Sequence, residues 1–433
     1  MQRDGHPPAP TGAQLPPAIL LQSDDWGLCA WSPDEEAWRE NRQLVSSPTA
    51  ADYCGSTLES PEEMRRLFAL LAAHPGADGL PAVMQANYVL CAPDYERIRA
   101  ENFRAWHGIE LPAVPPRWAR GDLIAAAHEG YRAGVWQPEY HGYTHGNTHR
   151  LLTLLQQRDP LAHHLFEREC WPLHDEVCGA EYWQGVEPRH LARGLQLFER
   201  LFGFPARSFV PSCYITSPGL AGGLRRGGVR VLQAANRNGP PPDRRTALHT
   251  LRLRAEHAWH RRLARIPRDA DFEPRGQSPH GTETPVWQAT LARVEAAVAR
   301  RGAAAISTHR LNYAHLDPTW VEASLAQLAL LLKGIADRIP GAVYLTDWEY
   351  AQLVVTGASV EQRGPSLVFR NYTRQPCLVC VPPTSAPLES AALTDRGLTV
   401  VDARRGVVRV PPGCHQLASA VELPSRQAGT TAS

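Results

Sequence analysis

Short apolar runs alternate with longer segments of helical period along most of the chain, as far as Val355. The apolar runs predict buried parallel strands at 18–23, 82–86, 136–141, 208–211, 229–234, 303–308 and 342–345. Segments with apolar residues three and four apart predict helices at 61–74, 121–132, 151–157, 161–169, 187–202, 286–301, 318–338 and 347–354. This alternation predicts a parallel sheet with helices outside it, either open or closed into a barrel.

Two segments depart from this alternation. Residues 236–285 are rich in Pro, Arg and Gly with weak periodicity, which predicts an insertion or long loop. After residue 357 the helical period disappears, and short β-branched runs follow at 366–369, 377–381, 398–401 and 407–410. We therefore expect a barrel domain at 18–357, a small antiparallel β-sandwich-like domain at 358–425, and flexible tails at 1–17 and 426–433.

The composition mainly argues against certain classes of protein. Lys+Arg 45 against Asp+Glu 44 gives a formal net charge of +1, so nothing favours a nucleic-acid or membrane-surface partner. The N-terminal residues lack a secretory pattern and no apolar stretch is long enough to span a bilayer, so we expect a cytoplasmic protein. The nine scattered Cys fit a reducing compartment, and Cys377 with Cys380 favours structural thiols over a metal site. Oligomeric state cannot be inferred from these patterns.

The first candidate for chemistry is the pair Asp24–Asp25, directly after the first predicted strand. Active sites of parallel α/β folds assemble at this end of the strands. Two adjacent carboxylates repel each other unless a cation neutralises one of them, so one Asp would bind a metal while the other takes a proton from water. A helix N-cap followed by a first-turn acid would produce the same pair without any function.

Histidines cluster after the strand at 136–141. His141, His145 and His149 are each four residues apart, a spacing that suits chelation of a metal such as zinc when the segment is helical. His149 is thus a rival ligand to His141. Late in the chain, His309 follows the strand at 303–308, where a histidine can serve as a general acid with a near-neutral pKa.

Together these motifs resemble those of the polysaccharide deacetylase family, the carbohydrate esterases with a NodB-like domain, over roughly 18–355. Asp24-Asp25-Trp26-Gly27 is similar to the family's Asp-Asp motif, and Glu139-Tyr-His141-Gly-Tyr-Thr-His145 to its His-x-x-x-His motif. The resemblance implies an irregular (β/α)7 barrel. It implies Asp24 as general base, His309 as general acid, and Asp25, His141 and His145 as ligands of one divalent metal, zinc being expected.

The chain also departs from the family pattern. Phe209 stands where the family has an Arg that braces the catalytic Asp, two residues before Pro211. We expect Arg207 or Arg230 to substitute, or the base to be tuned differently. The family's Asp-rich fourth motif is not evident near 229–233.

The resulting expectation is removal of an N- or O-acyl group, such as acetyl, from a carbohydrate. The aromatic residues Trp26, Tyr143 and Tyr214 lie near the motifs and, with Pro211, form the predicted substrate-binding set. Two alternatives stay open at this point. A glycoside hydrolase of a related barrel type would need two separated carboxylates, and a carbohydrate-binding barrel without activity would explain the missing Arg.

Overall fold

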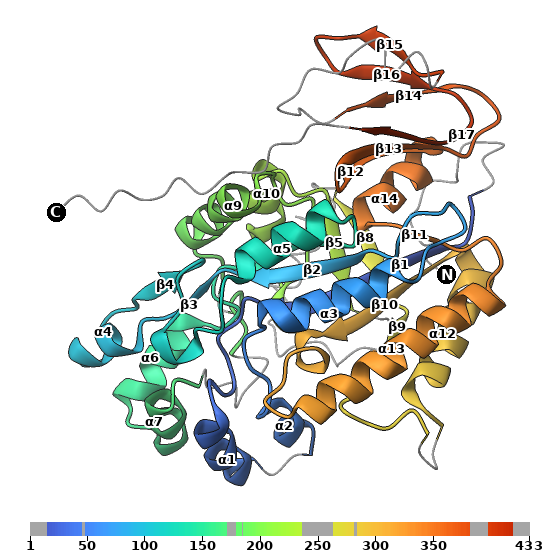
Figure 1. Ribbon diagram of the computed structural model, residues 1–433. Helices are drawn as coiled ribbons and strands as arrows, with labels where there is room; N and C mark the ends of the chain where they lie inside the picture. The colour runs from blue at the N-terminus through green and yellow to red at the C-terminus, as the bar shows by residue number, and fades with distance from the viewer. Residues whose placement is uncertain are drawn as a thin grey trace, which may run out of the picture.

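The computed structural model describes residues 15–45, 48–170, 179–183, 185–235, 263–280, 284–381 and 397–418. Residues 1–14 of the predicted tail at 1–17 lie outside these residues, as do the predicted tail at 426–433 and most of the predicted insertion. The predicted α/β barrel with a small antiparallel β-region after it is confirmed (Figure 1).

A nine-stranded parallel sheet forms the centre of the molecule, with strand order β8-β7-β6-β5-β2-β1-β10-β9 and with β11 paired to β1. No ladder joins β8 to β9 among the described residues, so the sheet is a barrel-like wall with one open seam. Its strands are β1 (Ala18–Trp26), β2 (Met84–Val89), β5 (Trp136–Gly142), β6 (Ser208–Phe209), β7 (Val231–Ala234), β8 (Ala264–Pro267), β9 (Ala270–Asp271), β10 (Ala303–His309) and β11 (Val343–Tyr344).

β8 and β9 correct the prediction of an unstructured insertion at 236–285. Both strands lie within that range, and both belong to the central sheet. β8 has only one buried residue among its four, Ile266, so it carries no apolar run that a sequence pattern could reveal. The error matters because Arg268 and Glu273, on either side of β9, reach the site described below.

Helices cover the outer surface of this sheet (Figure 1). α12 and α13 have the predicted bounds, and α3 begins with the capping box of Ser60 and Glu63. The packed helices are α3 (Pro61–Ala72), α5 (Leu123–Arg132), α9 (Pro188–Phe202), α10 (Leu220–Arg226), α12 (Val286–Arg301), α13 (Pro318–Arg338) and α14 (Asp347–Thr356).

Shorter elements, most of them unpredicted, gather beyond the carboxyl ends of the strands. Figure 1 shows α1, α2, α4, α6 and α7 on this side of the molecule. Apolar side chains of α4, α6 and α7 pack in a second cluster that includes Leu28, Tyr95 and Phe166. The elements are α1 (Glu35–Leu44), α2 (Pro48–Tyr53), β3 (Cys91–Pro93), α4 (Tyr95–Ala100), β4 (Gly108–Glu110), η1 (Pro116–Trp118), α6 (Thr148–Gln156), α7 (Pro160–Glu167), η2 (Ser212–Tyr214) and η3 (Arg310–Asn312).

The C-terminal region forms two antiparallel three-stranded sheets, β12-β13-β17 and β14-β16-β15. Apolar side chains from both sheets, such as Phe369 and Val408, share one buried cluster, which makes the arrangement a sandwich. The strands are β12 (Ala358–Arg363), β13 (Ser366–Asn371), β14 (Cys377–Cys380), β15 (Thr399–Asp402), β16 (Val407–Val410) and β17 (Gly413–Ala418). Cys377 and Cys380 are free thiols on β14.

A buried ion-pair network fastens this sandwich to the barrel. Glu349 of α14 pairs with Arg363 at 3.0 Å and with Arg370, and Arg370 also reaches Asp78 at 2.9 Å. Arg363 donates to the carbonyl of Gly134 at 3.4 Å. Asp78 and Gly134 precede β2 and β5, so the sandwich sits at the amino ends of the strands, away from α1 and α6 (Figure 1).

This placement predicts that the sandwich contributes nothing to chemistry at the carboxyl ends. His415 on β17 lies within hydrogen-bond distance of the carbonyl of Pro411, 3.2 Å away. We expect His415→Ala to leave turnover within about twofold of the wild-type value, since substitutions distant from a site act mainly on stability. Turnover assays beside a melting curve check this, and a folded but inactive His415→Ala would refute it.

Within the part of the chain that the structure describes, no helix is both long and apolar enough to cross a membrane.

Candidate metal centre and active site

The end of β1 places two carboxylates in one site. Its pairing with β2 shifts register between Ser23 and Trp26, and Asp25 has a left-handed φ of 75°. Asp is one of the few non-glycine residues that adopt this conformation readily. The irregularity re-aims the side chain. Asp25 Oδ1 lies 3.4 Å from both His141 and His145, and Asp24 Oδ2 lies 3.9 Å from His309, so both carboxylates belong to one site.

Contacts from Glu59 and Arg310 hold the loop that follows Asp24 and Asp25. Gly27 has a φ of 74°, and a Cβ there would lie 2.6 Å from the carbonyl oxygen of Val89, so only glycine fits. Its N–H donates to Glu59 at 3.0 Å. Glu59 is paired with Arg310 at 3.3 Å, and Arg310 donates to the carbonyl of Leu28 at 2.6 Å. These contacts join the segment that follows β1 to the segment that follows β10.

The three predicted metal ligands lie together and are buried. Asp25 Oδ1 is 3.4 Å from His141 Nε2 and 3.4 Å from His145 Nε2. All three potential ligand atoms lie within 4.8 Å of one another. Zinc–nitrogen and zinc–oxygen bonds of about 2.0–2.1 Å in a tetrahedron separate neighbouring ligand atoms by roughly 3.4 Å. The donor atoms therefore fit one cation of this kind.

The orientation of the His141 ring and the neutral state of His145 also fit metal binding. His141 Nδ1 lies 2.8 Å from the carbonyl of Val210, which fixes the Nδ1–H tautomer and leaves the Nε2 lone pair free. Burial lowers the pKa of His145 to about 4, so this ring is neutral at neutral pH. For His141, burial is outweighed by Asp25 and the pKa rises. Asp25 has a pKa far below its usual range because the histidines outweigh its burial, and it stays ionised.

The rival ligand His149 lies elsewhere. It is exposed on the first turn of α6, and it does not belong to the buried group of Asp25, His141 and His145. The segment from His145 to His149 includes the start of α6. His141 lies on β5, and the loop between His141 and His145 turns sharply, with a φ of 61° at His145. The four-residue spacing therefore brings His141 and His145 together through a turn, and not through the helix that the spacing suggested.

Asp24 is braced by an arginine from an unexpected place. Arg268, which follows β8, donates from both terminal nitrogens to the Asp24 oxygens at 2.6 Å each. Neither predicted substitute is among the hydrogen-bond partners of Asp24, which accepts side-chain hydrogen bonds from Arg268 and Asn87, while Arg230 donates to the carbonyls of Arg225 and Val229. Burial raises the pKa of Asp24, but Arg268 outweighs it and holds the pKa well below the usual range.

Arg268 stands in a polar network that fills part of the barrel interior. Its Nε donates to Gln22 at 2.9 Å, and Gln22 in turn donates to the buried Asp347 at 2.6 Å. Its Nη2 donates to Gln233 at 2.7 Å, and Asn87 donates to Asp24 at 2.7 Å. Hydrogen bonds from side chains on neighbouring strands thus fix the orientation of Asp24 and Arg268.

His309 is oriented by a second carboxylate. Its Nδ1 lies 2.7 Å from Glu273, which also accepts from Asn312 at 2.8 Å, and its Nε2 lies 3.9 Å from Asp24 Oδ2. Burial lowers the pKa of His309, but Glu273 outweighs it and raises the pKa to about 10. The imidazolium is therefore the form present at neutral pH, with Nε2–H directed toward Asp24. Glu273 and Arg268 were both missed because they lie in the weakly patterned segment 236–285.

The predicted substrate-binding residues divide into two groups. Trp26 is 1% exposed and packs against Trp136, and Tyr143 is buried with its hydroxyl donating to Glu110 at 2.8 Å. These two rings and buried Pro211 therefore offer no face to a sugar, which corrects the prediction. Tyr214 is partly exposed, and its hydroxyl accepts from Arg268 at 2.9 Å, beside Asp24. A partly exposed ring that the sequence did not single out, Tyr53, lies edge-on to His309 with centroids 6.3 Å apart.

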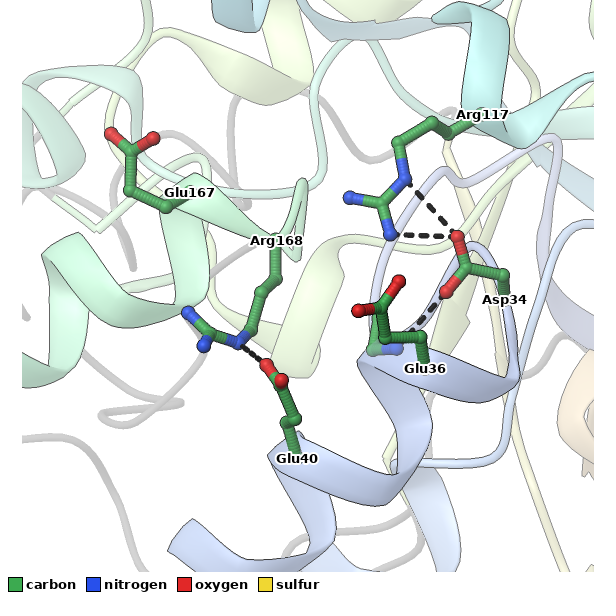
Figure 2. Close-up of a pocket in the computed structure, with 7 residues that line it drawn as sticks. Asp34, Glu36, Glu40, Arg117, Glu167 and Arg168 are labelled. Atoms are coloured by element: carbon green, nitrogen blue, oxygen red, sulfur yellow. Dashed lines mark hydrogen bonds and ion pairs between the residues drawn. The ribbon is translucent and has the colours of Figure 1, made fainter.

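A separate surface cavity of about 440 Å³ shares no residue with this centre. Figure 2 shows Arg117 against Asp34 and Arg168 against Glu40, and Glu167 pairs with Arg99 at 2.9 Å. Because its charged groups are largely paired with each other or with adjacent helices, we assign no ligand to it. The lining residues are Asp34, Glu36, Ala37, Glu40, Arg117, Glu167 and Arg168.

Comparisons by sequence give no match, either to a protein-family model or to a curated protein. Among solved structures, a provisionally named polysaccharide deacetylase from Mycobacterium smegmatis is 12% identical, with 80% of this chain and 95% of that chain covered and a TM-score of 0.36. A family 4 carbohydrate esterase from Streptomyces lividans, in complex with acetate, is 12% identical over 77% and 92%, with a TM-score of 0.28. A 4-alpha-glucanotransferase from Thermococcus litoralis is 10% identical over 77% and 40%, with a TM-score of 0.35. Scores at this level assign neither family nor activity.

Proposed function

We propose that the chain is a metal-dependent hydrolase that removes N- or O-acyl groups, such as acetyl, from a carbohydrate. The observation that carries the proposal is the meeting of three arrangements at one end of the sheet. These are a buried Asp25–His141–His145 group, an ionised Asp24 braced by Arg268, and a protonated His309 braced by Glu273. The resemblance of the Asp-Asp and His-x-x-x-His motifs to the polysaccharide deacetylases supports the carbohydrate substrate.

Asp25, His141 and His145 would hold the metal, for which zinc is the proposed identity. When bound, the metal supplies Lewis-acid polarisation of the acyl carbonyl and lowers the pKa of the attacking water. Asp24 orients that water and takes its proton on a carboxylate oxygen. Because Arg268 keeps Asp24 ionised, the base is in its accepting form at neutral pH.

His309 performs the complementary proton transfer. Its imidazolium stabilises the negative charge of the tetrahedral intermediate, and Nε2 then protonates the departing amine or alkoxide. Asp24 is protonated and His309 neutral once the acyl bond has broken. With 3.9 Å between Asp24 Oδ2 and His309 Nε2, the proton has a short return path that restores both groups.

The two alternatives receive less support. A glycoside hydrolase needs one carboxylic acid that stays protonated near neutral pH, whereas Asp24 and Asp25 both have lowered pKa values. Burial raises the pKa of Glu181 to about 7, but the oxygens of this carboxyl group accept from the backbone N–H groups of residues 143–145. A barrel without activity was suggested by the missing arginine, and Arg268, between β8 and β9, supplies a guanidinium to Asp24.

The test combines metal content with turnover. Purified protein is analysed for bound metal, stripped with a chelator and reloaded with zinc, while acetate release is followed on N-acetylated and O-acetylated oligosaccharides. We expect one metal per chain and acetate release that disappears on stripping and returns on reloading. Metal-free protein that cleaves a glycosidic bond, or loaded protein that releases no acetate from any of these glycans, would sink the proposal.

The Glu273–His309 pair predicts a specific pH dependence. Because Glu273 raises the pKa of His309 to about 10, the acid form persists up to that pH and activity declines above it. The same pair stabilises the fold fully below the ordinary histidine pKa of about 6.5, and this contribution is lost as pH rises toward 10.

Glu273→Gln removes the charge and keeps the shape of the side chain. We expect the alkaline limb of the kcat/KM profile to move down by about 1–3 pH units. Glu322→Gln, on the exposed face of α13 beside Arg66, is the matched control and should leave the profile in place. An alkaline limb that stays fixed in Glu273→Gln would show that His309 is not the acid.

A further inference from the structure

The segment around Glu181 lies along the loop that connects the two histidine ligands. Gly146 and Ala180 form an antiparallel bridge. The N–H of Glu181 donates to the carbonyl of His145 at 2.9 Å, and the N–H of Asn147 donates to the carbonyl of Gly179 at 2.6 Å. Residues 179–183 therefore run beside the loop and form backbone hydrogen bonds with it, outside the central sheet.

The Glu181 carboxylate accepts hydrogen bonds from the backbone N–H groups of this loop. It accepts from three consecutive backbone donors, Tyr143 at 3.3 Å, Thr144 at 3.3 Å and His145 at 3.1 Å. These donors occupy the turn between His141 and His145. A carboxyl group whose oxygens accept from several backbone N–H groups fixes the directions of those groups.

The loop needs such a partner because its backbone is strained. His145 has a φ of 61°, a conformation that costs a non-glycine residue about 1–3 kcal/mol and persists only when its surroundings enforce it. Gly142 has a φ of 125°, and a Cβ on it would lie 2.3 Å from Glu181 Oε2. The backbone thus approaches the carboxylate as closely as glycine permits, which places Glu181 inside the turn that aims both imidazoles.

We infer that Glu181 is a positioning residue for the metal centre, holding the 142–145 turn so that His141 and His145 present Nε2 to the cation beside Asp25. This inference rests on the metal site of the proposed function and is independent of the acyl substrate. Groups that orient metal ligands through hydrogen bonds contribute about 10–100-fold to metal affinity.

The test measures zinc affinity directly, by competition with a chromophoric chelator, in the full chain. Glu181→Gln keeps the size of the side chain but replaces one accepting oxygen with an N–H₂ group that faces backbone donors. We expect affinity to fall by about 10–100-fold. Glu181→Asp keeps the charge but shortens the reach, and we expect it to lose affinity in the same direction. If Glu181→Gln does not fold, the zinc affinity of Glu181→Asp tests the inference instead.

Glu187→Gln is the control, because Glu187 is exposed at the N-terminus of α9, six positions further along the chain. Cobalt loading adds a readout that a loss of general stability would not produce. The visible spectrum of bound Co²⁺ reports ligand geometry, so it should change in Glu181→Gln and Glu181→Asp and stay constant in Glu187→Gln.

The outcomes separate this inference from the proposed function. A wild-type chain that binds neither zinc nor cobalt overturns both. Wild-type binding together with unchanged affinity and an unchanged cobalt spectrum in the folded Glu181 variants overturns the positioning role alone. Weakened affinity with an altered spectrum supports it even if no acetate is released from any glycan.

Discussion

Asp24→Asn is expected to lower turnover by about 10²–10⁴-fold, the usual contribution of a positioned general base, while the chain keeps its metal. The reason is that asparagine retains the size of the side chain, and its one oxygen can accept from Asn87 and from Nη2 of Arg268, but it cannot take a proton from water. Metal content survives because Asp25, His141 and His145 are untouched.

Asp25→Asn is expected to behave differently. It replaces an anionic ligand with a neutral one, so metal affinity falls first, activity falls as a result, and excess metal restores part of it. Metal stoichiometry and turnover measured side by side for the two variants distinguish these roles. The reverse pattern, with Asp24→Asn empty and Asp25→Asn loaded but inactive, would exchange the assignments. Unchanged activity in both would remove the hydrolase proposal.

Arg268→Met is expected to cost about 3–5 kcal/mol of unfolding free energy at neutral pH, because it leaves Asp24 as a buried charge without its partner. Both side chains of this pair are almost fully buried, at 1% and 5% exposure. The lowered pKa of Asp24 means that this stabilisation is present above the ordinary aspartate pKa of about 3.9 and is lost as pH falls below it. The deficit of Arg268→Met should therefore shrink in acid.

Urea unfolding of metal-free and metal-loaded protein measures the effect. Arg65→Met is the matched control, since Arg65 pairs with Glu129 on the surface at 2.7 Å with 56% and 41% exposure, and such pairs contribute about 1 kcal/mol or less. Combining Arg268→Met with Asp24→Asn should recover part of the loss, because no buried carboxylate is then left unpaired. A cost for Arg268→Met as small as that of Arg65→Met would show that the pair is not coupled to folding.

The sequence predicted the repeating core well because burial leaves a strong periodic signal there. α12 and α13 have the predicted bounds, and β1, β5 and β10 carry Asp24, His141 and His309 at their carboxyl ends. The residues that complete the site lacked such a signal. Arg268 and Glu273 follow strands of four and two residues, too short for a pattern. Glu181 acts through backbone groups, which no side-chain motif records.

The backbone conformation of the site could not be predicted from the sequence pattern either. Alternation along a strand predicts that Asp24 and Asp25 point apart, yet the left-handed φ of Asp25 brings both into one site. Histidines four apart suggested a helical face, whereas the turn at Gly142–His145 brings them together. In both cases the deciding factor is a backbone conformation imposed by contacts from distant segments.

The polar interior around Arg268 has a consequence for how this site can change over time. Gln22, Asn87 and Gln233 lie on strands of the barrel and also hold Asp24 or Arg268 by hydrogen bonds, and Asp347 at the start of α14 accepts from Gln22. A single exchange for an apolar residue would strand hydrogen-bonding groups in the interior at a cost of about 1–3 kcal/mol each. The side chains that support the base therefore cannot be replaced one at a time without destabilising the fold, even though a change at Asp24 alone is expected to remove the activity.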